Sequence, residues 1–143
     1  MKQWFGILIF ALLGTSFSKQ EKYLKVPAEG IKTIQLVLKD QFSGSVIEKY
    51  VLDQSNYTPF LADLNSSEEA PKLKMNITCY RFDVLYQDGR KIQLSTNGKG
   101  IGPTPVGYFI CAENLILKYF PVTKEKYCKP MNGGKPAKNN IGF

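Results

Sequence analysis

The sequence predicts a single α+β domain, in which an antiparallel sheet of about five strands carries one or two short helices. Hydrophobic residues make up 43% of the chain and aromatic residues 13%, which is enough for a core and favours strands. Apolar and polar side chains alternate along residues 31–39 and 80–86, as in strands with one buried face. Thr58 and Pro59 mark one clear helix start.

Residues 1–18 have the layout of a secretory signal peptide. Lys2 supplies a positive start, residues 4–13 form an apolar run, and small residues precede a cleavage position after Ser18. The run is shorter than a membrane span, which needs about 20 apolar residues. We therefore expect an exported chain, periplasmic or extracellular, with no transmembrane segment in its mature form. An uncleaved anchor and a buried first helix are the alternatives.

The net charge of +7 is concentrated near the end of the chain. Residues 124–143 hold five lysines and one glutamate, which account for four of the seven charges, and they are rich in Asn, Gly and Pro. We expect them to form a basic, mobile tail. Arg81 and Arg90 are the two arginines of the chain. Because arginine is the usual reader of guanine, no nucleic-acid partner is expected.

The residue types of the chain exclude several kinds of catalytic and metal site. There is no histidine, which removes the commonest general base and the Ser-His and Cys-His pairs of nucleophilic enzymes. Three cysteines without Cys-x-x-Cys spacing do not form a thiolate zinc site. Asp83 is expected to face solvent, and the adjacent Glu68 and Glu69 cannot converge on one substrate. The sequence therefore predicts no catalytic residue, no metal and no cofactor.

The first half of the mature chain predicts two strands and a helix. Residues 19–30 form a polar lead-in to a folded domain at residues 31–123. Apolar and polar residues alternate in residues 31–39 and 45–52, which predicts two strands on either side of a turn. A short helix follows at residues 58–64, with a threonine cap and a proline in its first helical position.

An Asp-Gly pair at residues 88–89 marks the turn of a hairpin. A two-residue loop would place Val84 opposite Gln93, an apolar residue opposite a polar one. A three-residue loop places Val84 opposite Ile92 and keeps the apolar residues of both strands on one face. We therefore predict a type I turn with Gly89 in the left-handed conformation and a G1 bulge.

The second half of the domain predicts a loop, a strand and a segment of mixed character. Residues 97–105 are rich in glycine and proline and indicate a long loop. Residues 106–110 predict a strand that returns beside residues 90–96. Residues 112–120 favour a short helix that ends before Pro121, with a buried strand as the alternative.

The loop at residues 97–105 is the predicted contact surface, because binding residues often lie on loops of a rigid scaffold. Lys99 stands at its tip, with Asn97 and Ile101 beside it and Tyr108 nearby. The Gly-Lys-Gly sequence around Lys99 does not form a phosphate-binding loop. The prolines that follow prevent the helix which such a loop needs.

One disulfide is expected, because an exported chain with three cysteines can form one internal bridge. The expected strand order places Cys79 and Cys111 at opposite ends of the sheet, beyond the reach of a disulfide. Cys111–Cys128 is therefore the preferred bridge, which would attach the tail to the sheet. Cys79–Cys128 and three free thiols are the alternatives.

Three asparagines, Asn56, Asn65 and Asn76, begin Asn-x-Ser/Thr sequences, the acceptor pattern of N-glycosylation. The chain is rich in lysine and poor in arginine, a composition typical of AT-rich bacterial genomes. We therefore interpret the three patterns as chance matches in a bacterial protein.

These observations predict an exported, non-catalytic binding module of the inhibitor, immunity or envelope-accessory type. Its partner would be a protein or an envelope polymer. One alternative is a small secreted hydrolase that uses carboxylates or a lone Cys128 or Cys79 as its nucleophile. Another is attachment to the envelope surface through the lysine-rich tail, whose charges would bind anionic lipid or polymer.

Overall fold

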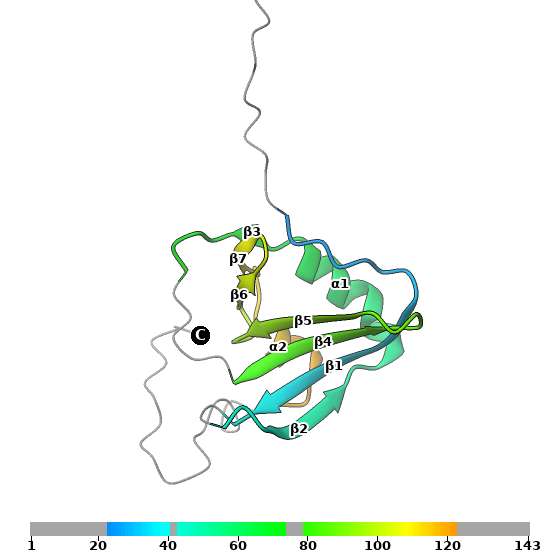
Figure 1. Cartoon of the computed structure of the whole chain (residues 1–143). Helices are drawn as coiled ribbons and strands as arrows, with labels where there is room; N and C mark the ends of the chain where they lie inside the picture. Colours follow the sequence, from blue (N-terminus) through cyan, green and yellow to red (C-terminus); the bar gives the residue numbers. More distant parts are fainter. Residues whose placement is uncertain (1–22, 41–42, 74–78, 123–143) are drawn as a thin grey trace, which may run out of the picture.

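The computed structural model describes residues 23–40, 43–73 and 79–122, which form one antiparallel sheet with two short α-helices (Figure 1). The sheet has seven strands, where the sequence predicts about five, in the order β2-β1-β4-β5-β6-β7-β3. The strands are β1 (Ile31–Lys39), β2 (Val46–Val51), β3 (Glu68–Glu69), β4 (Tyr80–Tyr86), β5 (Lys91–Thr96), β6 (Gly100–Thr104) and β7 (Gly107–Ile110). The helices are α1 (Tyr57–Asn65), which follows the 3-10 turn η1 (Gln54–Asn56), and α2 (Leu115–Tyr119).

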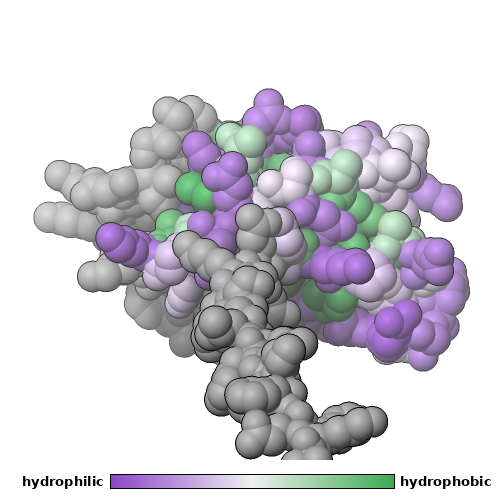
Figure 2. Space-filling model, turned by 90° about the horizontal axis from the view of Figure 1, so that it is seen from above, coloured by the Kyte–Doolittle hydropathy of each residue, from purple (hydrophilic) through white to green (hydrophobic). Residues whose placement is uncertain are grey.

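Four predictions fall outside the described residues: the signal peptide at residues 1–18, the tail at residues 124–143, the pattern at Asn76 and the position of Cys128. Among the helices of the described ranges, none combines the length and the apolar character that crossing a membrane requires. Seen from above, small hydrophobic areas lie between hydrophilic side chains on the described surface (Figure 2).

The core lies on one face of the sheet, where alternate residues of the two central strands are buried. Ile34 of β1 and Phe82 of β4 have no exposed surface. Phe60 of α1 meets Phe82 edge to face at 5.1 Å, and Phe120, directly after α2, stacks on Phe82 at 5.9 Å. Both helices therefore pack on the same face of the sheet.

The β4–β5 hairpin has the predicted three-residue turn. Val84 lies opposite Ile92, and the Tyr86 N–H donates to the carbonyl of Arg90 at 2.9 Å. Gly89 has a φ of 88°, which is the left-handed conformation. The parity argument from the sequence is therefore confirmed.

The first helix begins earlier than predicted. Thr58 is its second residue rather than its cap, because η1 leads directly into α1. Asp53 caps η1 by accepting a hydrogen bond from the Ser55 N–H at 2.9 Å. Pro59 still lies in the first turn of α1, where its missing N–H leaves no hydrogen bond unmade.

The lead-in is packed against the domain, although the sequence suggested a polar segment. Leu24 and Val26 are buried in the core. The Val26 N–H donates to Asn65 Oδ1 at 2.7 Å, and Asn65 Nδ2 donates to the Val26 carbonyl at 3.0 Å. Both ends of the Asn65 amide are therefore occupied, and they fasten the lead-in to the end of α1.

The predicted loop at residues 97–105 contains β6, which lies between β5 and β7. The expected direct pairing of residues 106–110 with β5 is therefore wrong. Ile101 of β6 faces Phe109 of β7. The reversal before β6 is tight because Thr96 Oγ1 donates to the Gly100 carbonyl at 2.7 Å.

The segment at residues 112–120 contains a helix, as the sequence favours. Asn114 caps α2 by accepting hydrogen bonds from the N–H groups of Ile116 and Leu117, both at 3.1 Å. The Tyr119 hydroxyl donates to Asp63 of α1 at 2.6 Å, which ties the two helices together.

Candidate functional site

The face of the sheet opposite the helices is the candidate site, and we call it the outer face. Its side chains alternate with the core residues of four neighbouring strands, β2, β1, β4 and β5. In this register Gln35, Asp83 and Gln93 lie side by side across three strands. The outer face comprises Thr33, Gln35, Val37, Lys39, Val46, Lys49, Val51, Arg81, Asp83, Leu85, Lys91, Gln93 and Ser95.

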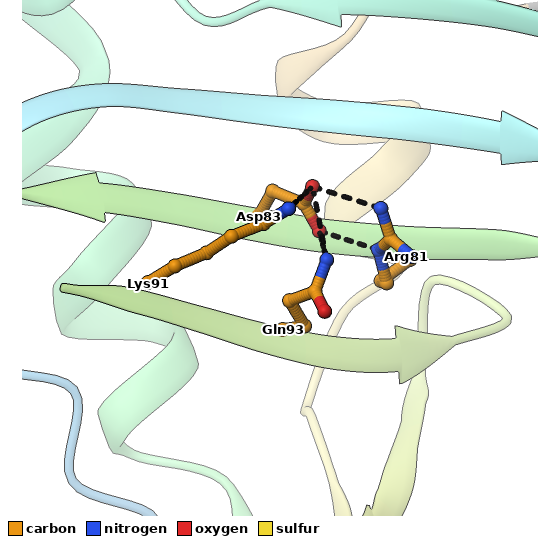
Figure 3. A network of polar contacts seen from close by, with 4 residues as sticks. All are labelled: Arg81, Asp83, Lys91 and Gln93. Carbon is orange, nitrogen blue, oxygen red and sulfur yellow. Dashed lines mark hydrogen bonds and ion pairs between the residues drawn. The ribbon is translucent and has the colours of Figure 1, made fainter. Parts of the chain in front are cut away.

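Four of these side chains form a polar network at the centre of the outer face (Figure 3). Arg81 and Asp83 are two residues apart on β4, and Lys91 and Gln93 are two residues apart on β5. Arg81 Nε donates to Asp83 Oδ1 at 2.5 Å, and Nη2 donates to Oδ2 at 3.0 Å. Lys91 Nζ lies 3.4 Å from Asp83 Oδ2. Two cations therefore converge on one carboxylate.

Gln93 completes the network from the neighbouring strand. In the orientation drawn, Gln93 Nε2 donates to Asp83 Oδ1 at 3.3 Å. With the amide turned over, its oxygen accepts from Lys91 Nζ at 2.8 Å and from Arg81 Nη2 at 3.0 Å. The amide finds partners in both orientations, and the second leaves it bonded to both cations.

Asp83 is buried, which corrects the expectation that it faces solvent. It lies on the polar side of β4, as predicted, but its side chain is only 1% exposed. Burial alone would raise the pKa of Asp83. The hydrogen bonds and charge of Arg81, together with the charge of Lys91, outweigh that effect and lower the pKa. Asp83 is therefore held as a carboxylate and is unsuited to donate a proton.

The outer face carries an excess of positive charge. Its ionisable residues are Lys39, Lys49, Arg81 and Lys91 against Asp83. The Lys91 side chain is 43% exposed, and that of Arg81 is 20% exposed. Since Arg81 and Lys91 are held by a buried carboxylate, their charges have fixed positions.

The sequence does carry a signal for this network. The Arg-x-Asp of β4 and the Lys-x-Gln of β5 each place two polar residues on one side of a strand. The correct hairpin register then puts Asp83 opposite Gln93. The prediction that Asp83 faces solvent therefore missed the convergence of Arg81, Lys91 and Gln93 on its carboxylate.

The predicted contact residues do not share one surface. Ile101 is 0% exposed and belongs to the core, so it is not available to a partner. Asn97 is 8% exposed and accepts from the Lys99 N–H at 3.1 Å and the Gly100 N–H at 2.6 Å, which shapes the turn. Tyr108 is half-buried, and its carbonyl accepts from the Ala70 N–H at 2.8 Å.

Lys99 lines a pocket of the described structure. The pocket lies where the end of α1, the β5–β6 turn and the end of β7 meet, and its volume is about 190 Å³. Small-molecule sites usually measure about 300–1,000 Å³, so this hollow is small. Its lining residues are Ser66, Glu68, Lys99, Ile110, Cys111 and Ala112.

The cysteines correct the preferred disulfide. Cys111 is a free, buried thiol, whereas Cys79 is disulfide-bonded. The bridge Cys111–Cys128 is therefore not formed in this structure. Burial, with a smaller contribution from the charge of Asp63, raises the pKa of Cys111 to about 12. This thiol is therefore protonated at neutral pH.

The part of the chain that the structure describes contains no cluster of three or more His, Cys, Asp or Glu side chains able to hold a metal ion. The chain matches no protein-family model, and comparisons with curated proteins and with solved structures likewise give no match. Arguments about function therefore rest on the chemistry of the residues described above.

Proposed function

We propose that this protein is an exported, non-catalytic binding module that uses the outer face of its sheet to bind a protein partner. The observation that carries this proposal is the pairing of Arg81 and Lys91 with the buried Asp83, on a face to which neither helix packs. Side chains already held in place lose little conformational freedom on binding. Export is part of the proposal and depends on the signal sequence at residues 1–18.

The charge of the outer face favours an acidic partner. Arg81 and Lys91 converge on the carboxylate of Asp83. Lys39 and Lys49 add further positive charge to this face. Opposite charge on the partner would accelerate association and exclude cationic competitors. The face is built from four adjacent strands, so it suits the broad surface of another protein. The small pocket at Lys99 is better suited to a single inserted side chain.

Cys79, one of the two candidate nucleophiles of the hydrolase alternative, is disulfide-bonded, and two further groups that a hydrolase could use are disfavoured by their surroundings. Cys111 has a raised pKa of about 12, so its nucleophilic thiolate form is scarce at neutral pH. Asp83 has a lowered pKa, so it would not serve as a general acid. These two properties support a binding role over the hydrolase alternative.

The test is capture of a partner by the full exported chain, carrying a C-terminal tag, from the envelope and medium of its own source. The variant Lys91→Gln removes one exposed charge from the outer face. Its matched control is Lys72→Gln, which removes an exposed charge from the loop after β3. We expect one stoichiometric partner, bound about tenfold less tightly by Lys91→Gln, or about 1.4 kcal/mol, and unchanged by the control.

Three other outcomes would contradict the proposal. In one outcome, the Lys91→Gln variant binds the partner as tightly as the unmodified protein does, whereas the Lys99→Ala variant does not bind it. This result would place the contact at the pocket. If polysaccharide or lipid is captured and no protein is, the ligand would be an envelope polymer or lipid. If salt-sensitive binding disappears when residues 124–143 are removed, the attachment would be through the tail.

A further inference from the structure

β2 is the edge strand at one end of the sheet, and in the described ranges it pairs with β1 alone (Figure 1). The Leu52 N–H, just after β2, donates to the carbonyl of Ile34 at 2.9 Å. Hydrogen-bonded positions alternate along an antiparallel strand. Lys49 and Val51 therefore direct their backbone N–H and C=O groups away from β1, towards the open edge.

The open edge carries an exposed apolar residue between two opposite charges. Val51 is 65% exposed, the highest value among the exposed large hydrophobic residues of the described chain. Lys49 precedes it by two residues and Asp53 follows it by two. Asp53 is still extended, with φ −64° and ψ 137°, so all three residues follow one strand direction. When a second copy of this segment runs antiparallel to the first, the positive residue of each copy can lie opposite the negative residue of the other.

Opposite charges favour one register for pairing with a second copy. When two identical strands pair antiparallel about a two-fold axis, a residue that precedes the axis position in one copy lies opposite the residue that follows it by the same number of positions in the other copy. An axis at Glu48 or at Lys49 would place like charges directly opposite each other, which is destabilising. An axis at Val51 places Lys49 of each copy opposite Asp53 of the other.

The other face of the same register is apolar. Tyr50 and Leu52 point to the core side of the sheet, because they alternate with Lys49 and Val51. With the axis at Val51, Tyr50 of one copy lies opposite Leu52 of the other. Leu52 is 3% exposed and Tyr50 packs against the core. This face therefore places no like charges opposite each other, and the register depends on Lys49, Val51 and Asp53.

We propose that the protein forms a symmetric dimer in which two β2 strands pair antiparallel about Val51, so that two sheets join into one. The two Val51 residues exchange N–H···O=C hydrogen bonds across the axis. Each Lys49 ammonium forms an ion pair with Asp53 of the second copy. Asp53 Oδ1 already accepts from the N–H and hydroxyl of Ser55, which leaves Oδ2 to receive the lysine.

The dimer uses Lys49 and Val51 at the β2 margin of the outer face and leaves Arg81, Asp83 and Lys91 open, so it does not depend on the proposed binding function. The contact comprises about five residues on each side, so the association is expected to be weak and concentration-dependent. Dimerisation would place two outer faces side by side and allow a partner with repeated acidic sites to bind both.

The test is the molar mass of the full mature chain in solution, by light scattering and sedimentation from about 10 µM to about 1 mM. The expected result is a rise from the monomer to the dimer mass. Lys49→Glu and Asp53→Lys each create two like-charge pairs across the axis, and each variant alone should be monomeric. The matched control Lys72→Glu should dimerise as the unmodified protein does.

Mixing the two charge variants provides the decisive comparison. A Lys49→Glu chain and an Asp53→Lys chain have opposite charges at both contacts, so an equimolar mixture should recover the dimer. A monomer at every concentration would overturn the proposal, as would dimeric charge variants or a mixture that stays monomeric. The partner test uses Lys91, which lies outside β2, so failure of one proposal does not imply failure of the other.

Discussion

The guanidinium of Arg81 forms two hydrogen bonds with the carboxylate of Asp83, its neighbour but one on β4. Residues two positions apart lie on the same face of a strand. The planar guanidinium group can therefore donate two parallel hydrogen bonds to the planar carboxylate. The pair is therefore local in sequence. Its burial depends on β5, which supplies Lys91 and Gln93 from the other side of the hairpin.

Replacement of Asp83 by asparagine should destabilise the protein. Arg81 and Lys91 would lose the carboxylate that neutralises them, and their charges would repel at a largely buried point. We expect the free energy of unfolding to fall by about 2 kcal/mol, below the range for fully buried pairs because both cations are partly exposed. Urea unfolding measures this change in the free energy of unfolding. Asp88→Asn removes the carboxylate of an exposed pair with Arg90 and should change it little; an equal effect would contradict the argument.

The same carboxylate should make stability depend on pH in acid. The pKa of Asp83 is lower in the folded protein than its ordinary value of 3.8. The stabilisation is therefore complete above that value and is lost as the pH falls towards the lower, folded pKa. The difference in unfolding free energy between the unmodified protein and Asp83→Asn should be constant from pH 7 to about pH 5 and shrink below pH 4. A difference that grows in acid would refute this sign.

The contact between Asn65 and Val26 should contribute to stability through two hydrogen bonds. Asn65→Ala would leave the N–H and carbonyl of Val26 without these partners in a part-buried position. We expect a loss of about 2 kcal/mol, and faster hydrogen exchange at the Val26 amide. Asn56→Ala is the matched control, because Asn56 makes no side-chain hydrogen bond as the cap of α1. Equal effects of the two substitutions would show that the lead-in is not fastened in this way.

The Cys111 thiol should resist alkylation in the folded protein. Its raised pKa of about 12 and its burial both disfavour the reactive thiolate. At pH 8, iodoacetamide should modify Cys111 in urea but not in native buffer, as mass spectrometry of the peptides would show. In the unreduced protein Cys79 should appear in a disulfide, and Cys128 is the one other cysteine left for it within the chain. A Cys79–Cys111 or Cys111–Cys128 peptide would contradict this assignment.

The parts of the fold set by local patterning could be predicted from the sequence. The β4–β5 register follows from the parity of apolar residues around Gly89, and α2 follows from helical spacing and the proline after it. β6 was missed because Gly100, Gly102 and Pro103 replace the alternation that marks a strand. Its pairing depends on β7, which a local pattern does not reveal.

The candidate site was harder to predict because burial is decided by neighbours distant in sequence. Ile101 lies in a glycine- and proline-rich segment typical of an exposed loop, yet it pairs with Phe109 and has no exposed surface. Asp83 has the position of a solvent-facing residue, yet two residues of β5 enclose it. The alternation of Leu24 and Val26 in the lead-in was a visible signal that the polar composition around it obscured.

The position of β1 between β2 and β4 has a consequence for the time course of folding. Hairpins such as β4–β5 close through short loops and form within microseconds. Ile34 of β1, by contrast, pairs with Val84 of β4, and α1 and β3 lie between them in the chain. Closing a loop of this length costs conformational entropy before the β1–β4 contacts can compensate for it. Contacts between residues far apart in the sequence therefore slow folding. The arrival of β1 beside β4 is therefore expected to set the folding rate, with the β4–β5 hairpin already formed as its template.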